Sequence, residues 1–134
     1  MNTLEITAIV RKYRRVAVVG ASPREERPSN QVMAYLMAAG FEVFPVNPGQ
    51  SEILGRECYP DLASVPKPVE IVDIFRRADQ VVPVVKAAIA AGARVVWMQE
   101  GIVNEEAAAL ALASGLAVVM DRCLKVEHMN LAGQ

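Results

Sequence analysis

The sequence contains few of the residues that build metal centres and disulfide frameworks. Its 134 residues include two cysteines and one histidine. Neither Cys58 nor Cys123 has Cys or His companions at ligand spacing. We therefore expect no metal site, and we expect both thiols to be free, as in a cytoplasmic protein.

Excess positive charge and long apolar runs are also missing. The net charge of −1 excludes a strongly basic protein that coats nucleic acid or a membrane surface. No apolar run is long enough to span a bilayer. The basic residues at positions 11–15 follow the first apolar segment instead of preceding it, which is unlike a signal peptide. We expect a cytoplasmic protein with neither nucleic acid nor a membrane as its partner.

What is present suffices for one folded domain. Hydrophobic residues make up 53% of the chain and charged residues 22%, which is typical of a globular protein and excludes a disordered one. A chain of this length can bury a core without disulfides or metals. We expect a single domain over residues 1–134.

Short apolar segments alternate with segments of helical periodicity. The apolar segments predict five strands, at residues 16–19, 41–46, 69–75, 93–99 and 116–120. Apolar spacing and end signals predict helices at residues 3–13, 29–39, 82–91 and 105–114. Asn2 and Asn104 stand at N-cap positions, and Pro83 must lie in the first turn of its helix. We expect one helical turn near residues 60–62 and a polar tail after residue 120.

This alternation predicts a three-layer α/β domain, in which an open parallel five-stranded sheet has helices on both faces. With right-handed crossovers we expect the strand order 3-2-1-4-5, whose winding reverses between strands one and four. Ligands of such sheets bind beyond the carboxyl ends of the strands, at the reversal point. The residues that follow the strands are therefore the candidates for a binding site.

Polar and positively charged residues gather at this carboxyl edge. Unpaired backbone N–H groups at the first turn, and the dipole of the next helix, would favour an anion, and arginine can bind a phosphate bidentately. Each feature alone also fits an ordinary turn or a solvated loop, but their convergence predicts a nucleotide-like ligand. The candidates are Gly20, Ala21, Ser22, Arg24, Arg27, Ser29, Asn30, Asn47, Pro48, Arg76, Arg77, Gln99, Glu100, Gly101, Asp121 and Arg122.

The signature of a nicotinamide dinucleotide site is absent. Such a site needs Gly-x-Gly-x-x-Gly after the first strand, but Gly20 is followed by Ala-Ser-Pro. It also places an acidic residue at the end of the second strand to hold the ribose, where this chain has Asn47. Both differences argue against NAD as the ligand.

Six segments in order resemble a known family. They are Val-Ala-Val-Val-Gly-Ala-Ser (16–22), Phe-Pro-Val-Asn-Pro (44–48), Leu-Gly (54–55), Val-Asp-Ile-Phe-Arg-Arg (72–77), Val-Trp-Met-Gln-Glu-Gly (96–101) and Asp-Arg-Cys-Leu-Lys-Val-Glu-His (121–128). Taken together, they resemble the small stand-alone CoA-binding proteins. That family is similar to the CoA-binding N-terminal domain of succinyl-CoA synthetase alpha subunits. The resemblance covers nearly the whole chain.

The resemblance implies a Rossmann-like fold that holds CoA, or a close derivative, at the carboxyl edge. By motif, the turn at 20–22 would meet the diphosphate, and Asn47 and Pro48 would border the adenosine. Residues 75–77, which add Phe75 to the candidates, would lie beside the adenine or a phosphate, and residues 99–101 would flank the pantetheine arm. The synthetases need a further domain with a phosphorylatable histidine, for which this chain has no room. We therefore do not expect ligase activity.

The expected function is binding of CoA or acyl-CoA without catalysis. An enzyme acting on an acyl-CoA or another nucleotide-linked substrate, with Glu100 as a base, and a protein-interaction module without a small ligand are the alternatives. The lone His128 is expected to be structural. Asp73, inside the third strand, is expected to be hydrogen-bonded and structural because burial of an unpaired polar group is unfavourable. A homo-oligomer or an unidentified protein partner stays open.

Overall fold

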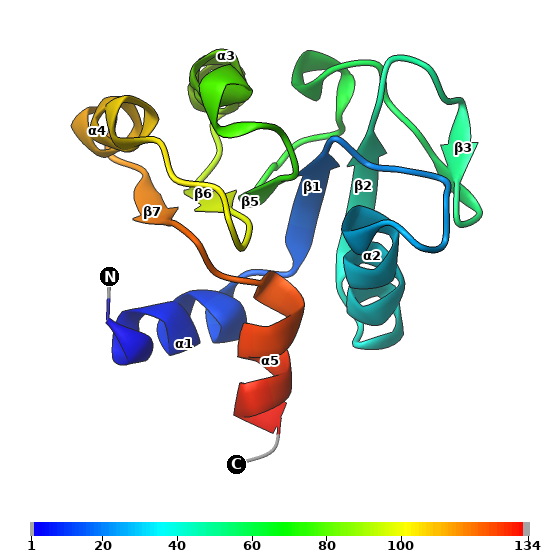
Figure 1. Ribbon diagram of the computed structural model, residues 1–134, viewed down its shortest axis with the longest axis horizontal. Coiled ribbons are helices and arrows are strands. Elements are labelled where there is room, and N and C mark those ends of the chain that lie inside the picture. The colour runs from blue at the N-terminus through cyan, green and yellow to red at the C-terminus, as the bar shows by residue number, and fades with distance from the viewer. Residues whose placement is uncertain (1, 133–134) are drawn as a thin grey trace.

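The centre of the molecule is a parallel sheet whose strands run in the order β2-β1-β5-β6-β7 (Figure 1). The computed structural model describes residues 2–132, and only the backbone of residue 132. The five strands fall on the five apolar segments of the sequence, which confirms the α/β class and the parallel sheet. They are β1 (Arg15–Val19), β2 (Glu42–Val46), β5 (Ile71–Ile74), β6 (Val95–Met98) and β7 (Ala117–Val119).

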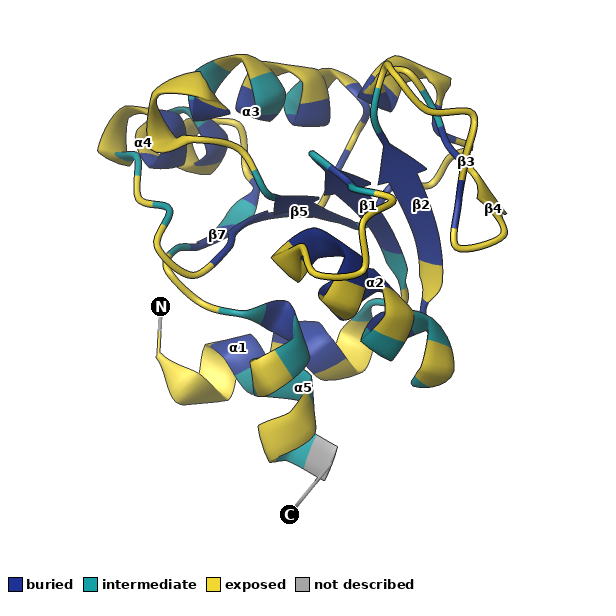
Figure 2. Ribbon diagram, turned by 45° about the vertical axis from the view of Figure 1, so that its right-hand side comes forward, coloured by how far each residue is buried: buried dark blue, intermediate teal, exposed yellow. Residues whose placement is uncertain are grey.

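Helices cover both faces of the sheet, as the sequence predicts. Helices α3 (Val81–Ala90) and α4 (Glu105–Ala113) pack on one face. The opposite face is covered by α1 (Thr3–Lys12), α2 (Pro28–Ala38) and α5 (Leu124–Ala132). Figure 2 shows the strands buried between these two layers, with the exposed surface on the outer sides of the helices. The apolar strands are therefore shielded on both sides, which is the arrangement that parallel sheets require.

Side-chain caps begin two of the helices at the residues that the sequence indicates. The Asn2 side chain accepts the Glu5 N–H at 2.9 Å, and the Asn104 side chain accepts the Ala107 N–H at 2.9 Å. Helix α2 begins one residue earlier than expected, at Pro28, because the first position of a helix does not need the N–H that proline lacks. Pro83 lies in the first turn of α3, as predicted.

The predicted strand order 3-2-1-4-5 is wrong. The third strand of the sheet, β5, pairs with β1 and not with β2, which lies at the edge. The physical reason is Pro45 in β2, whose carbonyl faces the outer edge and accepts the Tyr59 N–H at 2.9 Å. A strand paired along this outer edge would need a donor where proline has none, so β2 is confined to the edge. The winding therefore reverses between β1 and β5.

Several elements were not predicted. The expected polar tail forms helix α5, whose first residue, Leu124, is fully buried. The short strands β3 (Glu52–Ile53) and β4 (Arg56–Glu57) form a hairpin. The helical turn expected near residues 60–62 is a 3-10 turn, η1 (Leu62–Ser64), and a second one, η2 (Ala78–Gln80), precedes α3. Between residues 2 and 132, no helix is both long and apolar enough to cross a bilayer.

Asp73 differs from its expected environment. It lies in β5 between Val18 of β1 and Trp97 of β6, and it is fully buried. Neither carboxylate oxygen has a hydrogen-bond partner among the residues that the structure describes, so the expected hydrogen bonding is wrong. Burial raises the pKa of Asp73 well above its ordinary value, because an apolar layer disfavours the charged form.

Candidate functional site

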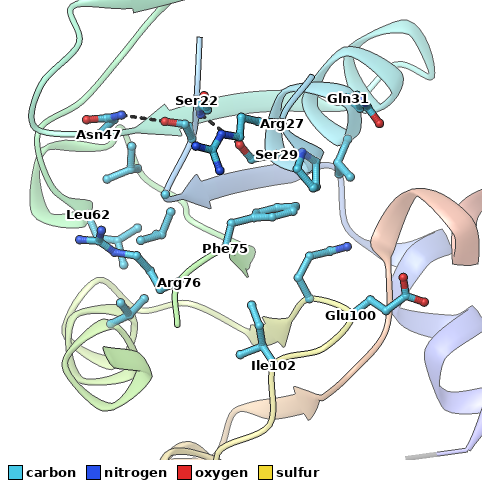
Figure 3. A pocket seen from close by; sticks show the side chains of 18 of the residues that line it. Ser22, Arg27, Ser29, Gln31, Asn47, Leu62, Phe75, Arg76, Glu100 and Ile102 are labelled. Carbon is cyan, nitrogen blue, oxygen red and sulfur yellow. Dashed lines mark hydrogen bonds between the residues drawn. The ribbon is translucent and has the colours of Figure 1, made fainter. Parts of the chain in front are cut away.

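A cavity of about 960 Å³ lies beyond the carboxyl ends of β1, β2, β5 and β6 (Figure 3). Its volume is at the upper end of the roughly 300–1,000 Å³ typical of small-molecule sites. It covers the reversal point between β1 and β5, where open α/β sheets bind ligands. Most of the predicted site residues line it: Gly20, Ala21, Ser22, Arg24, Arg27, Ser29, Asn47, Pro48, Phe75, Arg76, Gln99 and Glu100.

The other predicted residues lie outside the lining. Asn30 is buried behind it and donates its side-chain N–H to the Ser22 carbonyl at 2.9 Å. Arg77 is exposed and paired with Asp79 at 3.6 Å. Gly101 donates its backbone N–H to the Asp121 carboxylate at 2.7 Å, and Arg122 pairs with Glu127 at 3.2 Å. These residues therefore contact neighbouring loops of the protein and not the interior of the cavity.

Gly20 allows the β1 and β5 loops to approach closely. Its φ is +88°, and a Cβ at this position would lie 2.3 Å from the carbonyl oxygen of Phe75. No side chain fits at such a distance, and the positive φ is itself unfavourable for other residues. The glycine thus brings the turn after β1 against the residue that precedes Arg76.

The expected cradle of unpaired turn amides is not there. Gly20 and Ala21 both donate their backbone N–H groups to the Val46 carbonyl, at 3.2 and 3.3 Å. Ser22 donates its backbone N–H to the Ser29 hydroxyl at 3.0 Å. The prediction is wrong because these amides hold the turn itself together. The start of α2 offers its dipole to an anion, since no side chain caps it and its first turn carries no acidic residue. It offers few free amides, because Pro28 has no N–H and Asn30 donates its N–H to the Arg27 carbonyl at 3.1 Å.

Two arginines without an ion-pair partner bring positive charge to the cavity, which Arg24, Lys125, Asp61 and Glu100 also line. Arg27, at the N-cap of α2, and Arg76, after β5, both line it. Neither has an acidic partner within ion-pair distance in the part of the chain that the structure describes, whereas Arg24 pairs with Glu26 at 2.8 Å. Figure 3 shows that Arg27 and Arg76 reach the cavity from different segments, with the Phe75 side chain below Arg27 and to the right of Arg76. They are the side chains suited to bind phosphate.

Asn47 and Gln99 shape the cavity by holding its walls. Asn47 donates its side-chain N–H to the Ala21 carbonyl and accepts the Gly49 N–H, both at 2.8 Å (Figure 3). Both ends of its amide are therefore used within the protein, which leaves fewer hydrogen-bonding positions for a ligand bordered by Asn47. Gln99 is buried and accepts the Leu124 N–H at 3.3 Å, which joins the end of β6 to α5.

The sequence did not reveal the apolar walls of the cavity. One wall consists of Leu62 of η1, Pro83, Val84 and Ala87 of α3, and Ile102. The spacing of Pro83, Val84 and Ala87 on one face of a helix is a signal that could have indicated it. The other wall comes from Cys123, Lys125 and Val126. Lys125 and Val126 escaped prediction because they belong to α5, which was expected to be a polar tail.

The remaining candidate residues offer little chemistry at the cavity. His128 does not line it; its Nδ1 lies 2.7 Å from the Tyr35 hydroxyl. Cys58 is buried, which raises the pKa of its thiol. Among residues 2–132, no group of histidine, cysteine or acidic side chains could hold a metal ion. The site is thus rich in binding groups: a helix start, two arginines and two apolar walls.

Comparisons with known proteins identify relatives of similar sequence and fold. The YneT protein of Bacillus subtilis (strain 168) is 40% identical over 124 residues, which cover 92% of each chain. A solved structure of a hypothetical protein from Pyrococcus horikoshii OT3 superposes with a TM-score of 0.96 at 42% identity, over 99% of this chain and 94% of that one.

A larger protein contains a similar segment. The ADP-forming acetate–CoA ligase I of Archaeoglobus fulgidus is 30% identical over 87% of this chain, but the match spans only 18% of the ligase. A sequence profile described as the CoA binding domain matches residues 14–129. This match covers most of the chain and includes every strand of the parallel sheet and every predicted site residue. The chain belongs to the CoA binding domain family.

Proposed function

We propose that the cavity binds CoA, or a close derivative such as an acyl-CoA, and that the protein does so without catalysing a reaction. The observation that carries this proposal is the pair Arg27 and Arg76, which line one cavity without acidic partners in the described residues. The apolar walls offer a surface for the pantetheine arm, and the arginines offer charge for the phosphates. A cytoplasmic location remains the expectation.

The match to an acetate–CoA ligase supports binding and not ligation. The matched part is 18% of that enzyme, so its activity rests largely on residues without a counterpart here. Asn47 stands where an acidic residue would hold the ribose of NAD, and its side chain is occupied by Ala21 and Gly49. CoA therefore fits these residues better than a nicotinamide dinucleotide does.

Calorimetry of two neighbouring arginine variants tests the proposal. Arg76→Ala removes a charge that lines the cavity, whereas Arg77→Ala removes one that pairs with Asp79 outside it. We expect Arg76→Ala to weaken CoA binding about ten- to hundredfold, the effect of losing ~1.5–3 kcal/mol from a charge-assisted hydrogen bond. Arg77→Ala should bind as the wild type does. Equal affinities of all three proteins would contradict the proposed site.

Two further measurements separate the alternatives. Native mass spectrometry of the purified protein should show a retained mass that matches CoA. A protein with no measurable affinity for CoA, ADP or NAD would instead be an interaction module. Turnover of an acyl-CoA that disappears in Glu100→Ala would identify an enzyme and overturn the non-catalytic part of the proposal.

A further inference from the structure

Helix α5 closes one side of the cavity and packs against α1 and α2 on the outer side of the molecule. Lys125 and Val126 line the cavity, and the buried Leu124 inserts between the helix and the sheet. Val126 and Met129 remain about half exposed. A terminal helix whose outer apolar side chains are half exposed opens more readily than the central elements of a domain. The position of α5, and with it one cavity wall, therefore depends on the fully buried side chain of Leu124 together with its polar contacts.

His128 makes the main polar contact on the side of α2. Its Nδ1 lies 2.7 Å from the Tyr35 hydroxyl of α2. Its ring also packs edge-on against Tyr35 and Phe41, with centroid distances of 5.6 and 5.2 Å. His128 is partly buried in this cluster, so it joins α5 to α2 and to the start of β2.

The charged groups that face this cluster are positive. The Arg14 guanidinium lies 4.8 Å from the Phe41 ring centre and is held there by the carbonyls of Val10 and Tyr13, at 2.7 and 2.9 Å. Lys125, on α5 itself, lies 5.8 Å from the Tyr35 ring centre.

No acid compensates these cations beside the histidine. The neighbouring acid of α5, Glu127, is paired with Arg122. Within the described part of the chain, no carboxylate lies within ion-pair distance of the His128 ring. A proton on His128 would therefore add a third positive charge to a cluster whose Arg14 is held in place.

We propose that the His128–Tyr35 contact is a pH-sensitive latch that holds α5 against the cavity when His128 is neutral and releases it on acidification. Release displaces Lys125 and Val126 from the cavity wall. On the proposed function, this weakens CoA binding in acid. The latch itself does not depend on the identity of the ligand.

The direction of the effect follows from the environment of the ring. Burial, and then the charge of Arg14, lower the pKa of His128 from its ordinary value of 6.5. The docked helix therefore takes up a proton less readily than the released one. The stability of the docked helix is therefore complete at pH values above the ordinary histidine pKa of 6.5. It is lost as the pH falls below 6.5 toward the lower pKa of the docked histidine.

Hydrogen exchange without ligand tests the latch. We compare the protection of α5 amides at about pH 7.5 and about pH 5.5, on either side of the ~6.5 of an ordinary histidine, after correction for intrinsic rates. The wild type should lose protection in α5 several-fold in acid, while α4 on the opposite face keeps its protection. His128→Gln, which can still hydrogen-bond Tyr35 but does not titrate in this range, should lose none. Equal losses in both proteins, or no loss in the wild type, would overturn the latch.

Calorimetry then tests the link to the ligand. The ratio of CoA affinities of the wild type and His128→Gln cancels the titration of the CoA phosphate itself. We expect this ratio to fall several-fold between the two pH values. An unchanged ratio would overturn the link between latch and cavity. If CoA binds at neither pH while α5 still opens in acid, the latch stands and the proposed ligand fails.

Discussion

Asp73 places a titratable side chain in the middle of an apolar sheet. The folded protein favours its protonated form, because burial raises its pKa well above the ordinary value. The unfolded chain ionises it near the usual ~3.9. Unfolding therefore releases a proton over the range between these two pKa values. The contribution of Asp73 to stability is complete below the unfolded pKa and is lost as the pH rises toward the folded one.

Replacing Asp73 with asparagine should remove this pH dependence. The free energy of unfolding of Asp73→Asn, relative to that of the wild type, should increase with pH above about 4, with a slope of up to about 1.4 kcal/mol per pH unit. Urea denaturation between about pH 4 and pH 8 measures it. Asp79→Asn changes an exposed carboxylate and serves as the control. If Asp73→Asn and the wild type show parallel pH curves, Asp73 is not buried in its neutral form.

At the scale of the residue, a candidate site residue could be predicted when the signal for it lies next to it in the sequence. Arg76 follows the apolar strand β5 almost directly, and Arg27 stands immediately before the first residue of α2, so both positions are visible in the sequence. The use of each backbone amide was not predictable, because the Val46 carbonyl that accepts from Gly20 and Ala21 comes from another strand. The hydrogen bond of Asn47 was likewise not predictable, because its partner Ala21 lies 26 residues away in the sequence.

Among the elements, α5 and the edge strand β2 show where sequence patterns are informative and where they are not. Strands and capped helices have periodicity and end signals, and these predicted most of the fold. Helix α5 has no clear apolar stripe, since Val126 and Met129 are about half exposed, so only its tertiary contacts stabilise it. The edge position of β2 was readable from Pro45, but the predicted strand order did not take it into account.

The docking of α5 depends chiefly on Leu124. This side chain is fully buried, so Leu124→Ala should lower the free energy of unfolding by about 2–5 kcal/mol. Leu112→Ala, in α4, changes a leucine that is 60% exposed, and it should stay within about 0.5 kcal/mol of the wild type. Urea denaturation at neutral pH compares the two variants. Equal losses from both would mean that Leu124 adds nothing to the packing of α5.

At the scale of the whole molecule, the local charge of the cavity contrasts with a net charge of only −1. A nearly neutral protein exerts little long-range attraction on an anionic ligand. Any electrostatic contribution to binding must then come from nearby groups, and Arg27 and Arg76 are the two arginines of the cavity lining that have no acidic partner among the described residues. Variants studied at several salt concentrations can distinguish attraction by the overall charge from attraction by groups in the cavity. Charges more than a Debye length of about 10 Å apart are largely screened at about 0.1 M salt, whereas groups in contact are screened less.

The salt dependence of CoA affinity should therefore decrease when Arg27 and Arg76, the two unpaired arginines of the cavity, are removed. Between about 0.05 and about 0.5 M salt, the wild type should lose affinity because ions compete with the contacts of Arg27 and Arg76. The Arg27→Ala/Arg76→Ala double variant should bind more weakly and respond less to salt. Arg11→Ala/Arg77→Ala changes the net charge equally but leaves the cavity lining intact, so it should keep the wild-type response. If both double variants respond to salt alike, the attraction comes from the overall charge and not from arginines that contact the phosphates.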